Sequence, residues 1–283
     1  STAADVLSGG EGQDTVAYSL AAASMVVDLG TGTASTLEGG SSVTDTLSSI
    51  ENVTGSAFDD VITGGAGNNV LDGGLGNDVL AGAGGFDTAS YASAGAGVTV
   101  DLGGQGDATP DTFGGAGSDT LSSIESVLGS DFSDDLRGDA GGNTISGGAG
   151  DDLITGGLGD DVLTGGEGSD TFDYNEGEAG HDVITDFTLA HVDDGGDSLD
   201  FTDMLTGDEF TPESLADHLS FASNGNGGTI IGIHPSGVEG SAPVQTISLE
   251  NVSLLDLQAY AGSDSEVEII RKLLDNGNLR NRA

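Results

Sequence analysis

The sequence predicts an all-β fold: a parallel solenoid of the β-roll or β-helix type, with strand-bearing insertions, closed by a small mixed α/β cap. Three observations predict this fold. A nine-residue motif recurs in tandem, which is the mark of a stacked solenoid. A longer segment that separates blocks of this motif occurs twice. After residue 173 the glycine density falls, and the chain takes on the pattern of separate strands and short helices.

The nine-residue motif is clearest over residues 129–173, where it reads Gly-Gly-x-Gly-x-Asp-x-apolar-x. Its glycines allow the left-handed backbone angles of a tight loop. The rest of the motif is long enough for only a brief strand, so two motifs make one coil, and coils stack at about 4.8 Å. A flexible glycine-rich linker would require neither a fixed acidic place nor a fixed apolar place. The sixth place holds Asp134, Asn143, Asp152, Asp161 and Asp170, and the eighth holds Leu136, Ile145, Ile154, Leu163 and Phe172.

Stacked coils place one sixth-place carboxylate above another. At an effective dielectric constant near 20, two charges about 4.8 Å apart repel by roughly 3.5 kcal/mol, so the column requires a cation between them. Carboxylate and carbonyl oxygens are hard ligands, which suit calcium rather than zinc or copper. The sequence therefore predicts several Ca²⁺ ions as its cofactor.

The same register occurs earlier in the chain, at Glu51, Asp60, Asn69, Asp78 and Asp87. Glu51, like Glu125 in the second block, lacks the Gly-Gly loop, and we interpret the two glutamates as edge residues that cap the ion column. Asn69, like Asn143, keeps one side-chain oxygen but loses a charge, which predicts weaker sites at the two asparagines.

Two insertions, residues 18–54 and 91–128, interrupt the motif. Each begins with a Tyr, continues through an Ala/Ser-rich part to an apolar pair before Asp-Leu, and ends on Asp-Thr-Leu-Ser-Ser-Ile-Glu. Their β-branched residues predict strands. We therefore divide the chain into a first block with its insertion (1–90), a second insertion and block (91–173), and a C-terminal cap and secretion-signal region (174–283).

In the C-terminal region we expect strands at residues 183–187, 199–201, 229–233 and 244–249. Residues 211–213, Thr-Pro-Glu, supply an N-cap, a proline and an acid ahead of Leu215 and Leu219, which predicts a short helix.

A second helix is predicted further on. Residues 263–266 form a capping-box pattern, and Gly277 marks the C-terminal end of the helix. Its apolar face of Val267, Ile270 and Leu274 has to dock on a neighbour. The region as a whole is expected to cover the open end of the solenoid, which a repeat column needs.

Composition limits the partners. The chain has 48 acidic residues against five Lys and Arg, for a net charge of −43. Nucleic acid is excluded, because binding it needs a basic surface, and an anionic membrane repels such a chain. No apolar run is long enough to insert into a membrane, and no N-terminal signal peptide is evident. We expect a monomer. Because the chain opens in mid-motif at residues 5–8, we expect it to be a fragment of a longer chain.

The absence of cysteine is informative as well. A secreted protein without disulfides has to be held together by something else, and a bound metal is the obvious substitute. With six sites at tenfold excess over their Kd, calcium would contribute roughly 8 kcal/mol, comparable to the whole stability of a domain, about 5–15 kcal/mol.

The motifs that begin at Gly9, Gly64, Gly73, Gly114, Gly147, Gly156 and Gly165 resemble the repeats-in-toxin (RTX) nonapeptides. The resemblance covers most of residues 5–17 and 55–173, with the two insertions as additions typical of the family. It implies a calcium-loaded parallel β-roll in which each ion lies between the loops of motifs n and n+2. The pairs would be Asp60 with Asp78, Asn69 with Asp87, Asp134 with Asp152, Asn143 with Asp161, and Asp152 with Asp170. The implied ligands, from carboxylates, amides and loop carbonyls, are Asp14, Asp60, Gly65, Gly67, Asn69, Gly74, Gly76, Asp78, Asp87, Asp119, Asp134, Asn143, Gly148, Gly150, Asp152, Gly157, Gly159, Asp161, Gly166, Gly168 and Asp170.

The tail is similar to the C-terminal target region of type I secretion substrates, and most similar to the version on giant bacterial adhesins. The resemblance rests on residues 182–187, Asp-Val-Ile-Thr-Asp-Phe, and on residues 197–201, Asp-Ser-Leu-Asp-Phe. It implies that Asp186 and Asp197 bind a further calcium, although residues 188–196 are inserted between them.

The resemblance implies the C-terminal module of a large extracellular adhesin, located outside the cell or on the bacterial surface, with a role in adhesion and biofilms. Its partners would be the type I secretion machinery and the rest of the parent chain. Such a module leaves the cytosol unfolded, and folds outside the cell when calcium neutralises its carboxylates.

Catalysis within the chain is not expected. The four histidines, His181, His191, His218 and His234, form no HExxH pair, and there is no cysteine nucleophile or Gly-x-Ser-x-Gly elbow. Asp pairs such as Asp160–Asp161 give one member to calcium and leave the other as a solvated turn residue. One alternative is the same module on a secreted protease, lipase or polysaccharide epimerase. A surface for ice or carbohydrate is disfavoured, since the third motif place shows no row of Thr and Asn.

Overall fold

The computed structural model describes residues 4–36, 43–103, 107–110, 117–205, 210–234, 237 and 242–281. The chain divides into two compact units, residues 1–136 and 137–283. Each unit is described by itself. The three sequence segments proposed above remain predictions.

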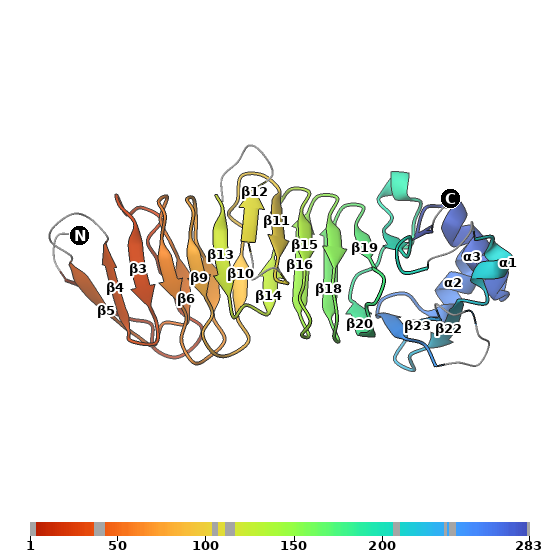
Figure 1. The fold of residues 1–283 in the computed structure, drawn as a ribbon, viewed down its shortest axis with the longest axis horizontal. Helices are drawn as coiled ribbons and strands as arrows, with labels where there is room; N and C mark the ends of the chain where they lie inside the picture. The colour runs from red at the N-terminus through yellow and green to blue at the C-terminus, as the bar shows by residue number, and fades with distance from the viewer. Residues whose placement is uncertain are drawn as a thin grey trace. The chain divides into compact units, whose positions relative to one another are not determined.

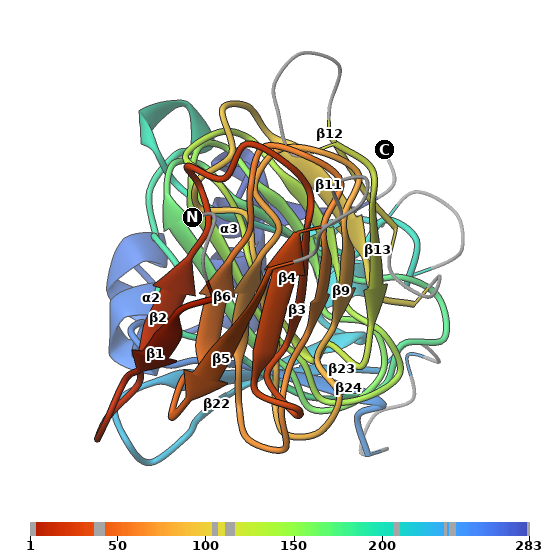
Figure 2. The same cartoon turned by 90° about the vertical axis from the view of Figure 1, so that its left-hand side faces the viewer.

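Unit 1 consists of short strands that belong to two sheets and alternate between them except within the two insertions (Figures 1 and 2). One sheet has the order β1-β5-β4-β3-β7-β9-β13-β12-β11 and the other β2-β6-β8-β10-β14. The strands are β1 (Val6–Ser8), β2 (Thr15–Ala17), β3 (Met25–Asp28), β4 (Thr33–Thr36), β5 (Thr44–Ser48), β6 (Asn52–Thr54), β7 (Val61–Thr63), β8 (Val70–Asp72), β9 (Val79–Ala81), β10 (Thr88–Ser90), β11 (Val98–Asp101), β12 (Asp107–Pro110), β13 (Asp119–Ser122) and β14 (Ser126–Leu128), with β15 (Asp135–Arg137) at the unit boundary.

The register confirms the predicted coil. β7 pairs in parallel with β9, so that Val61 lies beside Val79 and Ile62 beside Leu80, 18 residues further on. Two nonapeptides therefore make one turn. Because side chains alternate across a strand, the eighth-place residue points inward and its neighbours point outward. Ile62 and Leu80 are fully buried, whereas Val61 is 37% exposed. One apolar residue per half-coil thus fills the interior.

Both insertions contain strands, as predicted, and they add an antiparallel arrangement that the sequence did not reveal. In the first, β3 pairs antiparallel with β4, and β4 with β5, while β3 also pairs in parallel with β7 of the roll. In the second, β11, β12 and β13 are antiparallel, and β13 pairs in parallel with β9. The motif predicted to begin at Gly114 lies partly outside the described residues.

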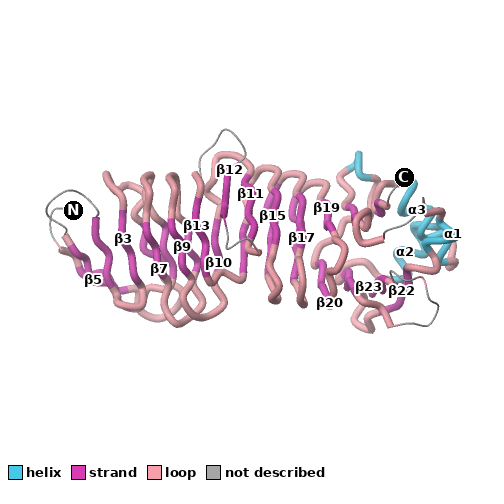
Figure 3. The backbone as a smooth tube through the Cα atoms, in the orientation of Figure 1, coloured by secondary structure: helices cyan, strands magenta, loops and turns pink. Residues whose placement is uncertain are grey.

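Unit 2 continues the same pattern and then changes into the cap (Figure 3). Its sheets have the orders β17-β19-β21-β25 and β16-β18-β20-β24-β23-β22. The strands are β16 (Thr144–Ala149), β17 (Leu153–Thr155), β18 (Val162–Glu167), β19 (Thr171–Asp173), β20 (Gly180–Ile184), β21 (Ser198–Asp200), β22 (Leu219–Ser223), β23 (Thr229–Ile233), β24 (Gln245–Leu249) and β25 (Leu279–Arg280). The helices are η1 (Val192–Asp194), α1 (Pro212–Leu215), α2 (Leu254–Ala261) and α3 (Glu266–Asp275).

The cap supplies the next strand to each sheet of unit 2. β24 adds in parallel to β20, and β25 adds in parallel to β21, with Leu279 beside Leu199. Large aromatic rings replace the aliphatic interior near this end. Phe172 lies 6.3 Å from Phe187, and Tyr174 lies 5.6 Å from Phe201, measured between ring centroids. The cap therefore closes the hydrophobic interior of unit 2, as predicted.

The helices of the cap were predicted only in part. α1 begins at Pro212 with Thr211 as its N-cap, as expected, but it ends at Leu215, and Leu219 lies on β22. α2 was not predicted at all. Its N-cap Ser253 forms a capping box with Asp256.

The predicted cap of α3 was wrong. Ser265 is the N-cap and makes no side-chain cap hydrogen bond, while the Ser263 hydroxyl accepts the Ser265 N–H. The reason is local: α2 ends on Gly262 in the left-handed conformation, and the chain has one short turn before α3. α3 ends at Asp275, close to the predicted Gly277. Its buried face is Ile269, Ile270 and Leu273, so of the three predicted docking residues only Ile270 is fully buried. In the described part of the chain, no helix is long and apolar enough to cross a membrane.

Candidate metal centre

The sixth-place side chains form hydrogen-bonded ladders along the coils. Each accepts the backbone N–H of the sixth-place residue one coil earlier. In unit 1, Asp60 N–H donates to Asp78 Oδ1 at 2.7 Å, and Asp78 N–H donates to Asp119 Oδ1 at 2.9 Å. Three further bonds join a backbone N–H to a carboxylate Oδ1 in the same way: Asn69 N–H to Asp87 at 2.8 Å in unit 1, and Asn143 N–H to Asp161 at 2.7 Å and Asp152 N–H to Asp170 at 3.0 Å in unit 2. Four of the five predicted pairs thus lie on adjacent coils, while the pairing of Asp134 with Asp152 stays a prediction.

The second oxygen of several ladder carboxylates has no hydrogen-bond partner. These atoms are the Oδ2 atoms of Asp14, Asp78, Asp87, Asp161 and Asp170, all buried. A buried acceptor without a partner costs about 1–3 kcal/mol, and more when it is charged. Such an oxygen is suited to a hard cation, because a cation removes this penalty and supplies the missing positive charge. The residues therefore fit calcium.

The loop glycines let the carboxylate approach the backbone. A Cβ on Gly73 would lie 2.1 Å from Asp78 Oδ2, and one on Gly165 would lie 2.2 Å from Asp170 Oδ2, so only glycine fits the first place. The second-place Gly74 has a φ of +91°, which other residues rarely adopt. Among the predicted glycine ligands, positive φ occurs at Gly74, Gly76, Gly148, Gly150, Gly157, Gly159, Gly166 and Gly168, but not at Gly65 and Gly67.

A calcium ion at these loops would combine one or two carboxylates with loop carbonyls. Across the described ranges, no three His, Asp or Glu side chains gather as a metal-binding group. Backbone carbonyl oxygens are the other hard ligands that the loops offer, and calcium accepts six to eight oxygens in variable geometry.

Burial raises the pKa of the ladder carboxylates in the absence of calcium. The pKa of Asp78 rises to about 8, mainly through burial and further through the charges of Asp119, Asp60 and Asp59. Burial raises the pKa of Asp161 and of Asp170 to about 6. Ionised ladder carboxylates are thus unfavourable without a cation. This agrees with the absence of hydrogen-bond partners on their second oxygens.

Glu51 is not an edge residue, contrary to the sequence interpretation. Its side chain accepts the Asp14 N–H at 3.0 Å, while its carbonyl accepts the Asn69 amide. Coils therefore lie on both sides of it. Glu125 accepts the Asp87 N–H at 2.9 Å in the same way. The longer glutamate side chain replaces a sixth-place Asp where the Gly-Gly loop is missing.

The ladder continues into the cap through Asp182, which sequence reasoning missed. Asp161 N–H donates to Asp182 Oδ1 at 3.1 Å, and Gln245 donates to its other oxygen at 2.6 Å. Its only sequence signal is the pattern Asp-x-apolar, displaced by three residues from the nine-residue register. Burial raises the pKa of Asp182 to about 7.

The two predicted tail ligands already have hydrogen bonds on both oxygens. Asp197 accepts the N–H groups of Asp170 at 3.0 Å and Thr188 at 2.7 Å. Asp186 accepts those of Gly165 at 3.0 Å and Gly166 at 2.9 Å. The two acids therefore hold the last nonapeptide loop and the start of the insertion, and their role as calcium ligands stays a prediction.

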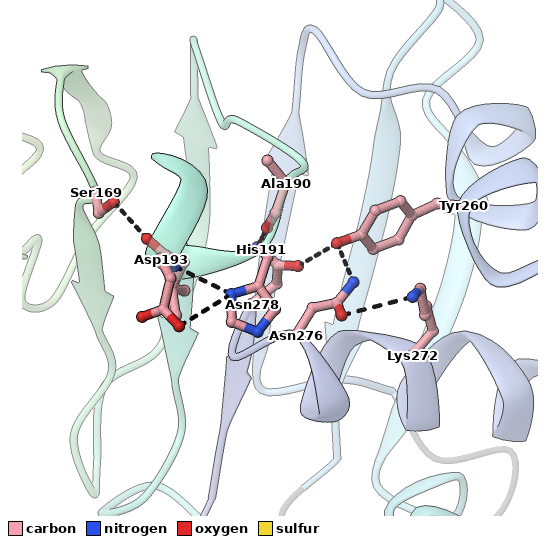
Figure 4. Close-up of polar contacts among 9 residues, drawn as sticks. Ser169, Ala190, His191, Asp193, Tyr260, Lys272, Asn276 and Asn278 are labelled. Carbon is pink, nitrogen blue, oxygen red and sulfur yellow. Dashed lines mark hydrogen bonds and ion pairs between the residues drawn. The ribbon is translucent and has the colours of Figure 1, made fainter.

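The insertion of residues 188–196 is tied down by polar contacts on both sides (Figure 4). Ser169 of the last nonapeptide loop donates to the Val192 carbonyl at 2.9 Å. The fully buried Asn278 donates to the carbonyls of Ala190 at 2.6 Å and Asp197 at 2.7 Å, and accepts the Tyr260 hydroxyl at 3.0 Å. The C-terminal segment is thus linked to the end of the ladder.

Two further groups of residues make hydrogen bonds within the fold: the acids that directly precede the ladder residues, and the histidines. Asp160, exposed as predicted, accepts the His181 N–H at 2.9 Å. His191 accepts the Asp193 N–H at 3.1 Å. The His218 ring contacts the His234 carbonyl at 3.0 Å.

The family comparison agrees with this geometry. A family model described as the RTX calcium-binding nonapeptide repeat (4 copies) matches residues 1–18, 54–89, 128–163, 137–172 and 152–184. The fold and site define a parallel β-roll of calcium-binding repeats. This chain carries RTX nonapeptide repeats, and calcium is their cofactor.

Two solved structures are similar to parts of the chain. One is the AlgE6R3 subunit of the Azotobacter vinelandii mannuronan C5-epimerase, with 26% identity, covering 46% of this chain and 75% of the subunit, at a TM-score of 0.33. The other is the extracellular lipase LipA of Serratia marcescens, with 19% identity, covering 72% of this chain and 38% of the lipase, at a TM-score of 0.27. No curated protein matches the chain.

Proposed function

We propose that this chain is the C-terminal calcium-binding module of a large extracellular bacterial adhesin, which directs type I secretion and folds on Ca²⁺ outside the cell. The observation that supports this most is the set of buried Oδ2 atoms without a hydrogen-bond partner, at Asp14, Asp78, Asp87, Asp161 and Asp170. A chain with that many buried bare acids is unstable in the low calcium of a cytosol, and stable where calcium is abundant.

The ligand set of this proposal consists of the loop carbonyls and the sixth-place acids whose second oxygen is buried without a hydrogen-bond partner. Each ion binds only when two coils are stacked, because its oxygens come from two loops. Binding is therefore coupled to folding, and the calcium binding energy becomes folding energy. The module needs no disulfide for the same reason.

A calcium titration tests the folding part of the proposal. Chelation is expected to abolish the β signal in far-UV circular dichroism, and calcium is expected to restore it cooperatively with several ions per chain. Magnesium at equal concentration serves as the control, since it demands octahedral geometry and dehydrates reluctantly. A β spectrum that survives complete chelation at about pH 8, where protons do not replace calcium on most of the buried acids, would refute calcium-dependent folding.

The export part of the proposal rests on the tail. Residues 182–187 and 197–201 carry the similarity to secretion targets, and β25 at the C-terminal end is part of the folded cap. The chain, coexpressed with a type I exporter, is expected to reach the medium. A version that lacks residues 254–283 is expected to stay inside. Equal export of both versions would exclude the C-terminal segment as the signal.

The adhesin assignment rests on the kind of tail. The alternative is the same export module on a secreted protease, lipase or polysaccharide epimerase. The two proposals share every site residue and differ only in the rest of the parent chain, so the sequence of that parent decides between them. In either case the secretion machinery is a transient partner, and the folded product is secreted or remains at the cell surface.

A further inference from the structure

The nonapeptide loops are of two kinds, which differ in the direction of the second-place N–H. In four loops this N–H donates to the sixth-place side chain of the same loop. The donors are Ser56 to Asp60, Gly65 to Asn69 at 2.7 Å, Ser130 to Asp134 at 2.6 Å, and Asp139 to Asn143 at 2.8 Å. We refer to these four as closed loops.

The other kind, which we refer to as open loops, includes the loop of Asp14, whose second place, Gly10, has a φ of +110°. Four further open loops end on Asp78, Asp87, Asp161 and Asp170. Their second places are Gly74, Ala83, Gly157 and Gly166, with φ values of +91°, +73°, +97° and +109°. A left-handed residue at this point reverses the peptide plane, so the N–H does not bond to the carboxylate. In each open loop Oδ2 is left buried without a partner.

The closed-loop carboxylates of Asp60 and Asp134 have hydrogen-bond donors on both oxygens. The Ser56 hydroxyl donates to Asp60 Oδ1 at 2.8 Å, in addition to the Ser56 N–H on Oδ2. Met25, the first residue of the inserted strand β3, donates its N–H to Asp60 Oδ1 at 2.6 Å. Both oxygens of the Asp60 carboxylate therefore have hydrogen-bond donors within the protein itself, without a metal.

The second insertion repeats this arrangement with different residues. The Ser130 hydroxyl donates to Asp134 Oδ1 at 2.8 Å, and Val98, the first residue of β11, donates its N–H to the same oxygen at 2.7 Å. The loop sequences, Gly-Ser-Ala-Phe-Asp-Asp from residue 55 and Gly-Ser-Asp-Phe-Ser-Asp from residue 129, share Ser and Phe in place of two glycines. The same solution thus occurs wherever an inserted strand rejoins the column.

The asparagines fit the closed kind as well. Asn69 accepts the Gly65 N–H and the amide group donates to the Glu51 carbonyl at 2.6 Å. An aspartate at residue 69 would place a carboxylate oxygen against that carbonyl. The amide is therefore the better side chain there, and its missing charge matters only if a cation has to be bound.

We propose that the closed loops of Asp60, Asn69, Asp134 and Asn143 supply no side-chain ligand to calcium, and that the repeats that follow each insertion begin with a calcium-independent coil. Ions bind through the open-loop acids. The closed loops then act as a preformed support, at the point where an insertion ends, on which the calcium-loaded coils stack. This inference rests on the proposed calcium-dependent folding of the chain.

The test compares two double variants of the full chain. Asp60→Asn with Asp134→Asn alters two closed loops, and Asp78→Asn with Asp161→Asn alters two open loops. Native mass spectrometry at saturating calcium counts the ions bound to the folded chain, with circular dichroism as the check of folding. The first variant is expected to bind as many ions as the wild type, and the second to bind fewer. An equal loss of ions in both variants would overturn the inference.

A measurement on the unaltered chain keeps the test decisive if a variant fails to fold. Anomalous scattering from crystals grown with calcium is expected to show ions beside Asp78, Asp87, Asp161 and Asp170. Ion peaks coordinated by the Asp60 or Asp134 carboxylate would overturn the inference while leaving calcium-dependent folding intact. A folded chain without any ions would instead refute the proposed function.

Discussion

At the scale of the residue, the two oxygens of a ladder aspartate have different roles. In Asp161, Oδ1 accepts the Asn143 N–H at 2.7 Å, whereas Oδ2 is buried and has no hydrogen-bond partner. The first oxygen holds the backbone of the neighbouring coil, and the second is available to a cation. An amide in place of the carboxylate keeps the first role and removes the second, so Asn separates the two experimentally.

Asp161→Asn is therefore expected to weaken calcium-dependent folding while keeping the ladder hydrogen bond. A site at tenfold excess of calcium contributes about 1.4 kcal/mol to the free energy of unfolding, and the variant loses about that much. The matched control is Asp160→Asn, whose exposed side chain keeps an oxygen for the His181 N–H. A surface change of that kind stays within about 0.5 kcal/mol. Calcium titrations followed by circular dichroism measure both, and equal shifts in the two midpoints would contradict the assignment.

Sequence reasoning located the ladder acids but did not separate the two kinds of loop. The sixth-place register follows from counting, and every predicted partner pair lies 18 residues apart. Whether a loop is open or closed depends on the φ of its second place. In the loop of Asp60, Ser56 occupies the second place instead of glycine, and this substitution indicates a closed loop. In the loop of Asn69 the second place is still a glycine, Gly65, and yet its φ is not positive. A glycine permits both conformations, so its identity alone does not decide.

At the scale of the element, the roll strands were predictable and the cap helices only partly so. A three-residue strand such as β7 needs one buried residue, Ile62, and the nine-residue period marks it directly. α2 has no such signal, because it is short, buries only Leu257 and begins within a run of apolar residues. Its capping box at Ser253 and Asp256 was the available sequence cue. Between α2 and α3, the turn at Gly262 moved the N-cap of α3 from Ser263 to Ser265.

The two helix N-caps give a matched pair of substitutions. The Ser253 hydroxyl accepts the Asp256 N–H and the Asp256 carboxylate accepts the Ser253 N–H, so Ser253→Ala is expected to cost about 1 kcal/mol of helix stability. Ser265 makes no side-chain cap bond, so Ser265→Ala is expected to be nearly neutral. Hydrogen exchange at saturating calcium is expected to show α2 amides exchanging about fivefold faster in the first variant. Unchanged α2 exchange would show that tertiary packing, rather than the cap, holds the helix.

At the scale of the whole molecule, part of the net charge of −43 lies in buried ladders of carboxylates that need a counter-charge. A proton and a calcium ion compete for this role, since each neutralises a buried carboxylate. The sequence predicted the dependence on calcium, because its sixth-place acids stack in register in a chain that has 48 acidic residues against five Lys and Arg. It did not predict the competition, which depends on how deeply each acid is buried: Asp78 is 1% exposed and Asp161 fully buried.

The competition gives the folding equilibrium a definite pH dependence. Without calcium, the folded-state pKa of Asp78 is about 8, and those of Asp182 and Asp197 are about 7, against an ordinary value of 3.8. The folded chain therefore binds more protons than the unfolded chain between these values, and the free energy of unfolding falls as pH rises from about 4 to about 8. In chelator, the β signal is expected to strengthen when the pH is lowered from 8 to about 5.

Calcium-dependent folding has the opposite pH dependence, because calcium has to displace the protons that stabilise the ladder carboxylates at low pH. The calcium midpoint of folding is expected to rise between pH 7 and about pH 5, and binding is expected to release protons, measurable with a weakly buffered indicator. Asp78→Asn serves as the control, since it removes the acid with the highest of these pKa values and is expected to flatten the pH dependence above pH 7. A β signal that weakens on acidification in chelator, in a chain that stays soluble, would contradict the burial of protonated carboxylates. A calcium midpoint independent of pH would show that the ions bind elsewhere than on the ladder.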